Sequence, residues 1–166
     1  MKENINKIMD AGDIAKTVTR IAFQIYENHF EEKKLIIAGI AHNGVILGKR
    51  ILDELKRISE IEVVFIEIKI DKKNPRNPIK LSQDIGICKH QSIVVVDDVL
   101  NTGSTLIYAV THFLSMEIKK IQTAVLVNRN HKNFPIKGDF KGISLSTAIK
   151  ERIDVAFGEK EGVYLS

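Results

Sequence analysis

The sequence predicts an α/β domain with a mainly parallel central sheet flanked by helices. Apolar runs rich in β-branched residues alternate along the chain with stretches whose apolar residues recur at helical spacing. One run, SIVVVDD at residues 92–98, has an unbroken β-branched centre, as strands buried on both faces of a parallel sheet do. The length of 166 residues, with 44% hydrophobic and 28% charged residues, suits one domain over 1–166. We therefore expect strand-helix-strand units with right-handed crossovers.

The first half of the chain predicts a helix, a strand, a second helix and a second strand. The first helix has one apolar face and can be capped by Asp10 or Asp13. The first strand is a short apolar run, KLIIAGI, and a tight AHNG loop leads from it into the second helix. In order, these elements are expected over residues 9–29, 34–40, 45–58 and 61–70.

A basic segment rich in Asn and Pro follows the second strand. Residues 69–80, KIDKKNPRNPIK, hold five basic residues and one acid. The Asn and Pro residues over 74–78 break regular structure, and irregular loops of this length are often functional. We expect residues 69–84 to form a mobile loop.

The second half of the chain predicts a third strand, a helix, a fourth strand and two short strands. Thr102, Ser104 or Thr105 can cap the helix. The loop after the fourth strand carries Arg129 and His131, within a basic stretch without acids. In order, these elements are expected over residues 92–98, 104–116, 121–128, 152–158 and 162–166.

Composition narrows the functional classes only slightly. A net charge of +4 and a pI near 9.1 favour anionic partners such as phosphorylated metabolites or nucleic acid. The single cysteine, Cys88, and nearby His90 are too few for a structural zinc site. No apolar run approaches the roughly 18 residues of a membrane-spanning helix, and the opening MKENINKIMD lacks a signal-peptide core. We expect a cytoplasmic protein without a membrane partner.

The stretch VVVDDVLNTGST, residues 94–105, is the clearest functional signal. In parallel sheets ligands bind outside the carboxyl ends of the strands, where Asp97 and Asp98 are expected. The following NTGST leads into a helix, whose first N–H groups and neighbouring hydroxyls can bind phosphate. Gly103 allows a positive φ or a close backbone approach. Carboxylates beside a phosphate site must hold hydroxyl groups or a cation, so the pattern fits a ribose 5-phosphate, with or without Mg²⁺.

Other protein classes share parts of this pattern. Paired acids at a strand end also occur in metal-binding receiver domains and in nucleotide hydrolases, and TGST alone is a common helix cap. The sequence contains no G-x-x-x-x-G-K-[ST] and no G-x-G-x-x-G motif, which counts against nucleotide hydrolases and dinucleotide enzymes.

The same stretch resembles the 5-phosphoribosyl-1-pyrophosphate (PRPP) signature of type I phosphoribosyltransferases. GIAHNG, residues 39–44, is similar to their pyrophosphate loop, and residues 69–81 to their flexible hood. Nearly the whole chain is similar to one branch, the PyrR family of pyrimidine-operon regulators with uracil phosphoribosyltransferase activity. The chain departs from that branch at Ser104 and at His42-Asn43-Gly44, where members usually have arginine and T-R-G.

The resemblance implies a type I phosphoribosyltransferase fold and a reaction of PRPP with a nucleobase, with Mg²⁺ bound through PRPP at Asp97 and Asp98. Asn101 stands where purine-using members have an acid near the base nitrogen, so uracil is the expected base and UMP the product. Asp97, Asp98, Lys72 and Arg76 are the expected catalytic residues, with Lys72, Lys73 and Arg76 on the pyrophosphate side. The expected substrate-binding residues are Ala41, His42, Asn43, Gly44, Val99, Leu100, Asn101, Thr102, Gly103, Ser104, Thr105, Arg129 and His131.

Two functional classes remain open from the sequence. The first is a PRPP-dependent uracil phosphoribosyltransferase, expected to form a homodimer or homotetramer. The second is an RNA-binding regulator on the same scaffold, which senses uridine nucleotides and has little or no catalytic activity. A basic patch away from the nucleotide pocket would favour the regulator, and the first helical region supplies Lys7, Lys16 and Arg20.

Overall fold

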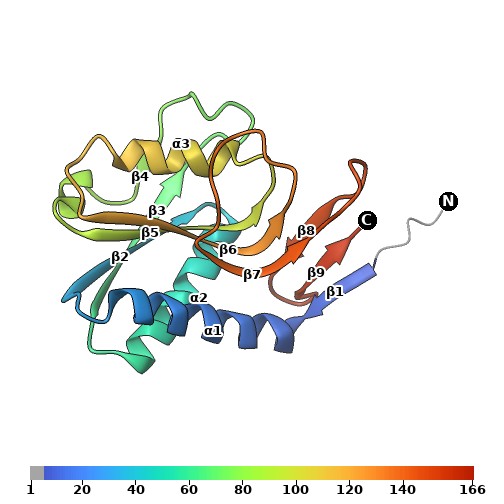
Figure 1. Cartoon of the computed structure of the whole chain (residues 1–166), viewed down its shortest axis with the longest axis horizontal. Coiled ribbons are helices and arrows are strands. Elements are labelled where there is room, and N and C mark those ends of the chain that lie inside the picture. The colour runs from blue at the N-terminus through green and yellow to red at the C-terminus, as the bar shows by residue number, and fades with distance from the viewer. Residues whose placement is uncertain (1–5) are drawn as a thin grey trace.

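The main sheet has six strands in the order β4-β3-β2-β5-β6-β7 (Figure 1). The computed structural model describes residues 6–166. All neighbouring strands are parallel except β3 and β4, which confirms the predicted α/β class. The strands are β2 (Lys34–Ile40), β3 (Glu62–Lys69), β4 (Lys80–Leu81), β5 (Ser92–Leu100), β6 (Lys120–Arg129) and β7 (Phe140–Leu145).

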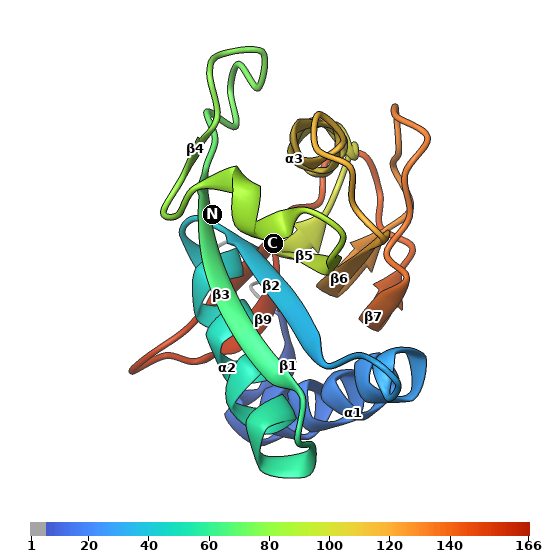
Figure 2. The ribbon, with the colours of Figure 1, turned by 90° about the vertical axis from the view of Figure 1, so that its left-hand side faces the viewer.

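Helices cover both faces of this sheet (Figure 2). Helices α1 (Ala11–His29) and α2 (Asn43–Ile58) lie on one face, and α3 (Ser104–Phe113) lies on the other. Because side chains alternate along a strand, Leu35 and Ile37 of β2 pack with α1 and α2, whereas Ile36 packs with Phe113 of α3. Both layers are fully buried, which explains why the strands read as continuous apolar runs.

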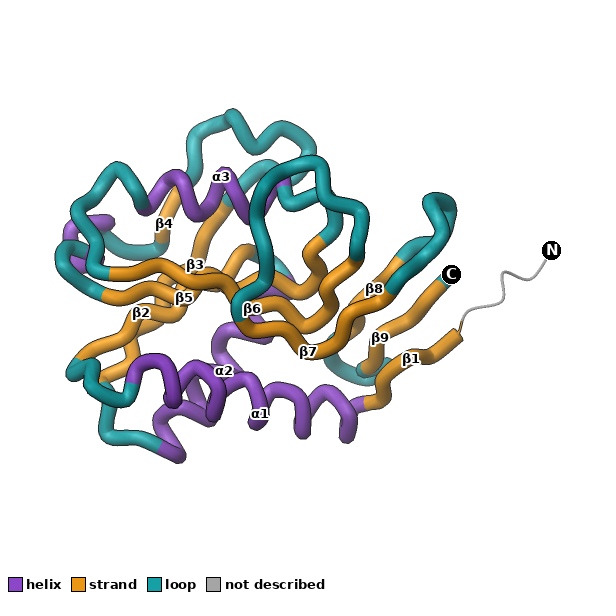
Figure 3. Tube along the Cα trace, viewed as in Figure 1, coloured by secondary structure: helices purple, strands orange, loops and turns teal. Residues whose placement is uncertain are grey.

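A second, antiparallel sheet joins the two ends of the described chain (Figure 3). Its order is β1-β9-β8, where β1 covers Asn6–Asp10, β8 covers Ile153–Ala156 and β9 covers Gly162–Leu165. The two later strands were predicted from the sequence. Strand β1 was not, because most of its residues are exposed and polar and its pairing partner lies at the far end of the sequence.

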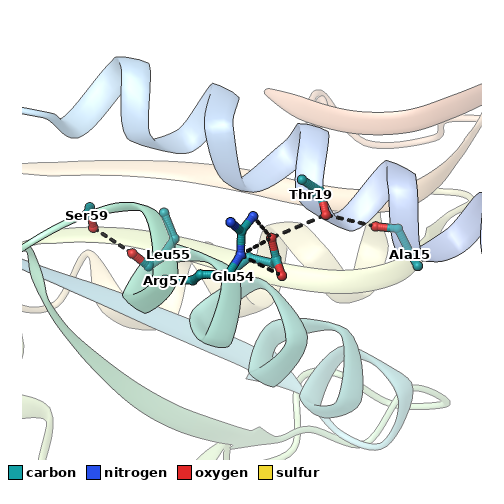
Figure 4. Close-up of polar contacts among 6 residues, drawn as sticks. All are labelled: Ala15, Thr19, Glu54, Leu55, Arg57 and Ser59. Atoms are coloured by element: carbon teal, nitrogen blue, oxygen red, sulfur yellow. Dashed lines mark hydrogen bonds and ion pairs between the residues drawn. The ribbon is translucent and has the colours of Figure 1, made fainter.

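Polar contacts fix the two helices on the lower face of the sheet in Figure 1 (Figure 4). Thr19 of α1 donates to the carbonyl oxygen of Ala15 and lies 3.3 Å from Glu54 Oε2 of α2. Arg57 donates to the same carboxylate at 2.7 Å, and α2 ends where Ser59 Oγ donates to Leu55 O at 2.7 Å. These contacts hold the C-terminal end of α2 against α1.

Several predicted boundaries differ from the structure by one to three residues. Strand β5 does not end at the acid pair, because Val99 and Leu100 continue its pairing with Val127 and Asn128 of β6. Helix α3 ends at Phe113, three residues before the predicted 116. The predicted cap Asp10 is confirmed for α1, where Asp10 Oδ1 accepts the Asp13 N–H at 2.8 Å. Within residues 6–166, no helix is both long and apolar enough to cross a membrane.

Candidate functional site

The order of the strands creates a crevice at the carboxyl ends of β2 and β5. From β2 the chain passes through α2 to β3 on one side, and from β5 it passes through α3 to β6 on the other. The two connections leave in opposite directions, so the loops that follow β2 and β5 separate above the sheet. Such a switch point is where parallel sheets bind ligands.

A cavity of about 280 Å³ occupies this crevice. Most of the residues that the sequence predicted for the site line it together. These are Asn43, Lys72, Asp97, Asp98, Val99, Leu100, Asn101, Thr102, Gly103, Ser104, Thr105 and Arg129.

Asp97 and Asp98 lie at the floor of the cavity in different environments. Asp97 is only 4% exposed, whereas Asp98 is half-buried. Asp97 Oδ1 accepts the backbone N–H of Asp98 at 2.9 Å and lies 3.2 Å from the Lys72 ammonium. Burial first, and then the negative charge of Asp98, raise the pKa of Asp97 to about 7, although Lys72 opposes the shift. Asp97 is therefore an acid whose charge changes near neutral pH.

The loop over residues 101–105 has the geometry of an anion cradle. Gly103 has φ of +86° and immediately precedes α3, whose first-turn N–H groups have no partner within the helix. A Cβ on Gly103 would lie 2.7 Å from Ile136 Cγ2, so the loop after β6 packs directly against it. That loop also braces Thr102, whose carbonyl oxygen accepts the N–H groups of Asn133 and Phe134 at 2.8 and 3.1 Å.

The helix cap differs from the prediction. Gly103 occupies the cap position without a side-chain hydrogen bond, so the expected cap by Thr102, Ser104 or Thr105 is wrong. Thr102 Oγ1 instead accepts the Ser104 N–H at 3.2 Å, across the turn. This leaves the helix end open towards the cavity.

The loop after β2 contributes only part of its predicted residues to this cavity. Asn43 lines it, and the absence of a side chain on Gly44 lets α2 approach β5, since a Cβ there would lie 2.6 Å from Val96 O. Ala41 and His42 instead line a separate hollow of about 360 Å³ with residues of the hood segment, residues 69–84. Their role in pyrophosphate binding stays a prediction.

The hood segment places one of its basic residues in the cavity. Asp71 organises its tip by accepting the N–H groups of Lys73 and Asn74 at 2.9 and 3.1 Å. Lys72 then reaches Asp97, whereas Arg76 turns back to Asn74 Oδ1 at 3.2 Å. The structure therefore brings Lys72 to the acid pair and leaves Arg76 outside it, so the role of Arg76 also stays a prediction.

Arg129 and His131 hold the segment that follows β7. Arg129 Nε donates to Thr147 Oγ1 at 2.7 Å, and His131 Nε2 lies 2.7 Å from Thr147 O. Arg129 lines both the main cavity and a neighbouring hollow of about 470 Å³, whereas His131 lines only the latter. These contacts support the wall of the site nearest Asn101.

Sequence reasoning missed one wall of the cavity. Strand β8 contributes Ile153, Asp154 and Val155, Arg152 just before it also lines the cavity, and Leu106 of α3 adds to the lining. The stretch RIDVAFG was correctly predicted as a strand, but its position against β5 depends on pairing in the small sheet. Nothing in its own sequence signals a ligand.

The carboxylates alone are a poor metal site. Among residues 6–166, no group of three or more His, Cys, Asp or Glu side chains could hold a metal ion together. A divalent cation at Asp97 and Asp98 would need most of its oxygen ligands from a bound substrate or water, as Mg²⁺ commonly does. The residues therefore fit a cation that arrives with a phosphorylated ligand.

Comparison with known proteins identifies the fold and family. The family described as "Phosphoribosyl transferase domain" matches residues 4–159. This chain belongs to the phosphoribosyltransferase family. It is 32% identical over 161 residues to "Bifunctional protein PyrR" of Streptococcus thermophilus (strain CNRZ 1066), covering 94% of this chain and 92% of the relative. "Pyrimidine operon regulatory protein" of Lactococcus lactis subsp. lactis (strain IL1403) is 32% identical over 162 residues, with the same shares covered.

Solved phosphoribosyltransferase structures confirm the type I fold. The hypoxanthine phosphoribosyltransferase of Trypanosoma cruzi superposes with a TM-score of 0.78 at 12% identity, over 96% of this chain and 95% of the other. A hypoxanthine-guanine phosphoribosyltransferase from Bacillus anthracis has a TM-score of 0.74 at 18% identity, over 97% and 98%. The predicted resemblance to the PyrR family is confirmed by the two relatives, each 32% identical over most of this chain.

Proposed function

We propose that this phosphoribosyltransferase transfers the 5-phosphoribosyl group of PRPP to uracil and releases UMP and pyrophosphate. One observation carries the proposal: a single cavity holds the open N-terminal end of α3 and, beside it, the acid pair. The helix end suits the 5-phosphate of a ribose, and the carboxylates suit its hydroxyl groups. The family and the fold support a pentosyltransferase activity.

The reaction breaks the bond from C1 of the ribose to pyrophosphate and forms a bond from C1 to a base nitrogen. The electron pair of the broken bond leaves with pyrophosphate, the nitrogen lone pair forms the new bond, and the N–H proton of the base is released to water. Lys72, beside Asp97, is placed to neutralise negative charge on the pyrophosphate side. Mg²⁺ bound with PRPP would add further neutralisation of the leaving group.

Base recognition falls to the wall formed by Asn101, Arg129 and β8. Asn101 offers an amide and cannot act as a proton acceptor at neutral pH, which favours a pyrimidine over the base chemistry of purine enzymes. Ile153, Val155 and Arg129 supply the remaining polar and apolar surface.

We expect that incubation with PRPP, Mg²⁺ and single free bases will yield a nucleotide from uracil and little from hypoxanthine or guanine. Chromatography of the products with a radiolabelled base measures this directly. The Asp98→Asn variant is the control, because loss of one carboxylate should weaken PRPP binding without changing the base wall. Nucleotide formed from a purine alone would contradict the uracil assignment, and no nucleotide from any base would contradict the enzyme.

The alternative is a regulator that binds RNA, and the relative named "Pyrimidine operon regulatory protein" favours it. The basic residues expected to contact RNA are partly engaged within the protein. Arg20 donates to the carbonyl oxygens of Gly142 and Lys141 at 2.7 and 3.3 Å, and Lys7 lies over the Tyr164 ring at 5.7 Å. Few free cations then remain on α1 to form a strong RNA surface.

We expect RNA binding to be weak and steeply salt-dependent, because scattered lysines contact phosphates without reading bases. Filter binding of a structured RNA and of its scrambled sequence, at low and at physiological salt, measures this. Sub-micromolar affinity that distinguishes the two RNAs at physiological salt would contradict this expectation and favour the regulator.

A further inference from the structure

We propose that Asn43 is a positioning residue that orients the Asp98 carboxylate for the ribose and ties it to the β8 wall. The inference rests on the proposed function, since it assigns how that site holds PRPP. Asn43 is the first residue of α2, and it lines the same cavity as Asp98 and Val155. Asn43 thus lies where α2, β5 and β8 meet.

The side-chain amide of Asn43 makes two hydrogen bonds, one to β5 and one to β8. Its Nδ2 donates to Asp98 Oδ2 at 2.8 Å and to the carbonyl oxygen of Val155 at 2.9 Å. An amide nitrogen carries two hydrogens, so both are used, and both acceptors require that the nitrogen faces them. A serine or a carboxylate at this position could not donate to both acceptors.

These contacts fix the orientation of Asp98. Its second oxygen, Oδ1, accepts the Val99 N–H at 2.8 Å, so the carboxylate is held from both sides. Each carboxylate oxygen can accept more than one hydrogen bond, which leaves capacity for a ribose hydroxyl. Because Asn43 is neutral, it orients the carboxylate without forming the ion pair that Lys72 forms with Asp97.

The backbone beside Asn43 prevents the amide from moving away. Gly44 packs so closely on β5 that a Cβ would lie 2.6 Å from Val96 O and 3.2 Å from the Asp97 Cα. The start of α2 is therefore fixed against the strand that carries Asp98. The same amide then sets the distance between Asp98 and the carbonyl of Val155 on β8.

A double-mutant cycle in PRPP affinity tests this role. Asn43→Ala should weaken binding of PRPP with Mg²⁺ by about tenfold, as expected for loss of a hydrogen bond to a charged group. If Asn43 acts through Asp98, Asn43→Ala should have little further effect in the Asp98→Ala background, where residue 98 offers no side-chain acceptor for the Asn43 amide. Titration calorimetry of the four proteins measures the affinities. Asn28→Ala is the matched control, because Asn28 also donates to a carbonyl oxygen, on the exposed side of α1.

A purely structural role predicts a different pattern. Asn43→Ala would then weaken PRPP binding equally in the wild-type protein and in the Asp98 variant, and it would lower thermal stability more than Asn28→Ala does. If the wild type still binds PRPP, this result would overturn the inference. Failure of the wild type itself to bind PRPP would overturn the proposed function, and the inference with it. The Asn43→Asp variant provides a further test. It places a second carboxylate beside Asp98, and because like charges repel, this variant should bind PRPP more weakly than the Asn43→Ala variant does.

Discussion

Gly103→Val is expected to abolish detectable binding of ribose 5-phosphate, whereas Ser104→Ala should weaken it only about two- to tenfold. The backbone of Gly103 has φ of +86°, which a β-branched residue rarely adopts. A Cβ there would also lie 2.7 Å from Ile136 Cγ2, and the loop that carries Ile136 braces Thr102. Ser104→Ala removes only one hydroxyl group, worth about 0.5–1.5 kcal/mol, and leaves the helix N–H groups in place.

Gly158→Val is the control that separates the effect of backbone strain from the effect of filling the phosphate loop. Gly158 has a similar φ of +101°, but a Cβ there would meet nothing within 4 Å. Calorimetric titration with ribose 5-phosphate should therefore find normal affinity for this control, and thermal unfolding of both variants would report the cost of strain. Unchanged affinity in Gly103→Val, or a sulfate in a soaked crystal bound only beside Lys72 and Arg76, would contradict the assignment of the loop to the phosphate.

Asp97→Asn is expected to stabilise the protein at pH 8 while weakening its affinity for PRPP. Burial and the charge of Asp98 raise the pKa of Asp97 from 3.8 to about 7. Between these values the folded protein binds a proton that the unfolded chain does not, so the contribution of Asp97 to stability falls as pH rises. A pKa shift of this size lowers the free energy of unfolding by roughly 4 kcal/mol at pH 8. The neutral, isosteric amide of the variant avoids most of that loss.

Urea unfolding of the wild type and of Asp97→Asn across pH 5 to 8 measures the difference. The variant should gain about 1–2 kcal/mol at pH 5 and about 3–4 kcal/mol at pH 8. Asp71→Asn is the control with the opposite sign, because hydrogen bonds from the backbone of Asn74 and Lys73 lower the pKa of the exposed Asp71. A difference between wild type and Asp97→Asn that is flat with pH would show that Asp97 ionises normally.

The sequence was sufficient for the site residues that follow one another along the chain. The acid pair and the phosphate loop lie in one continuous stretch, so their joint position follows from the strand-to-helix connection alone. Asn43 and Lys72 were predicted through the resemblance, and both line the cavity. Their partners, Asp98 and Asp97, could not be assigned individually, since this depends on which way each side chain points at the end of β5.

Features that depend on distant pairing were not predicted. Strand β7 lies at the sheet edge, and Lys141 and Leu145 are less buried than a core strand requires, so its alternation was weak. The β8 wall is positioned by pairing with β9, which itself pairs with β1. Arg76 was grouped with Lys72 because both are basic and close in sequence, but the turn around Asp71 points them apart.

The small sheet links completion of the cavity to the order of protein synthesis. Strand β5 and the phosphate loop leave the ribosome well before β8, and at about 5–20 residues per second the interval is several seconds. Pairing of β1 with β9 joins segments from opposite ends of the sequence, and such non-local contacts form slowly because a long loop must close first. A nascent chain therefore carries the acid pair and the phosphate loop for seconds before the β8 wall of the cavity exists.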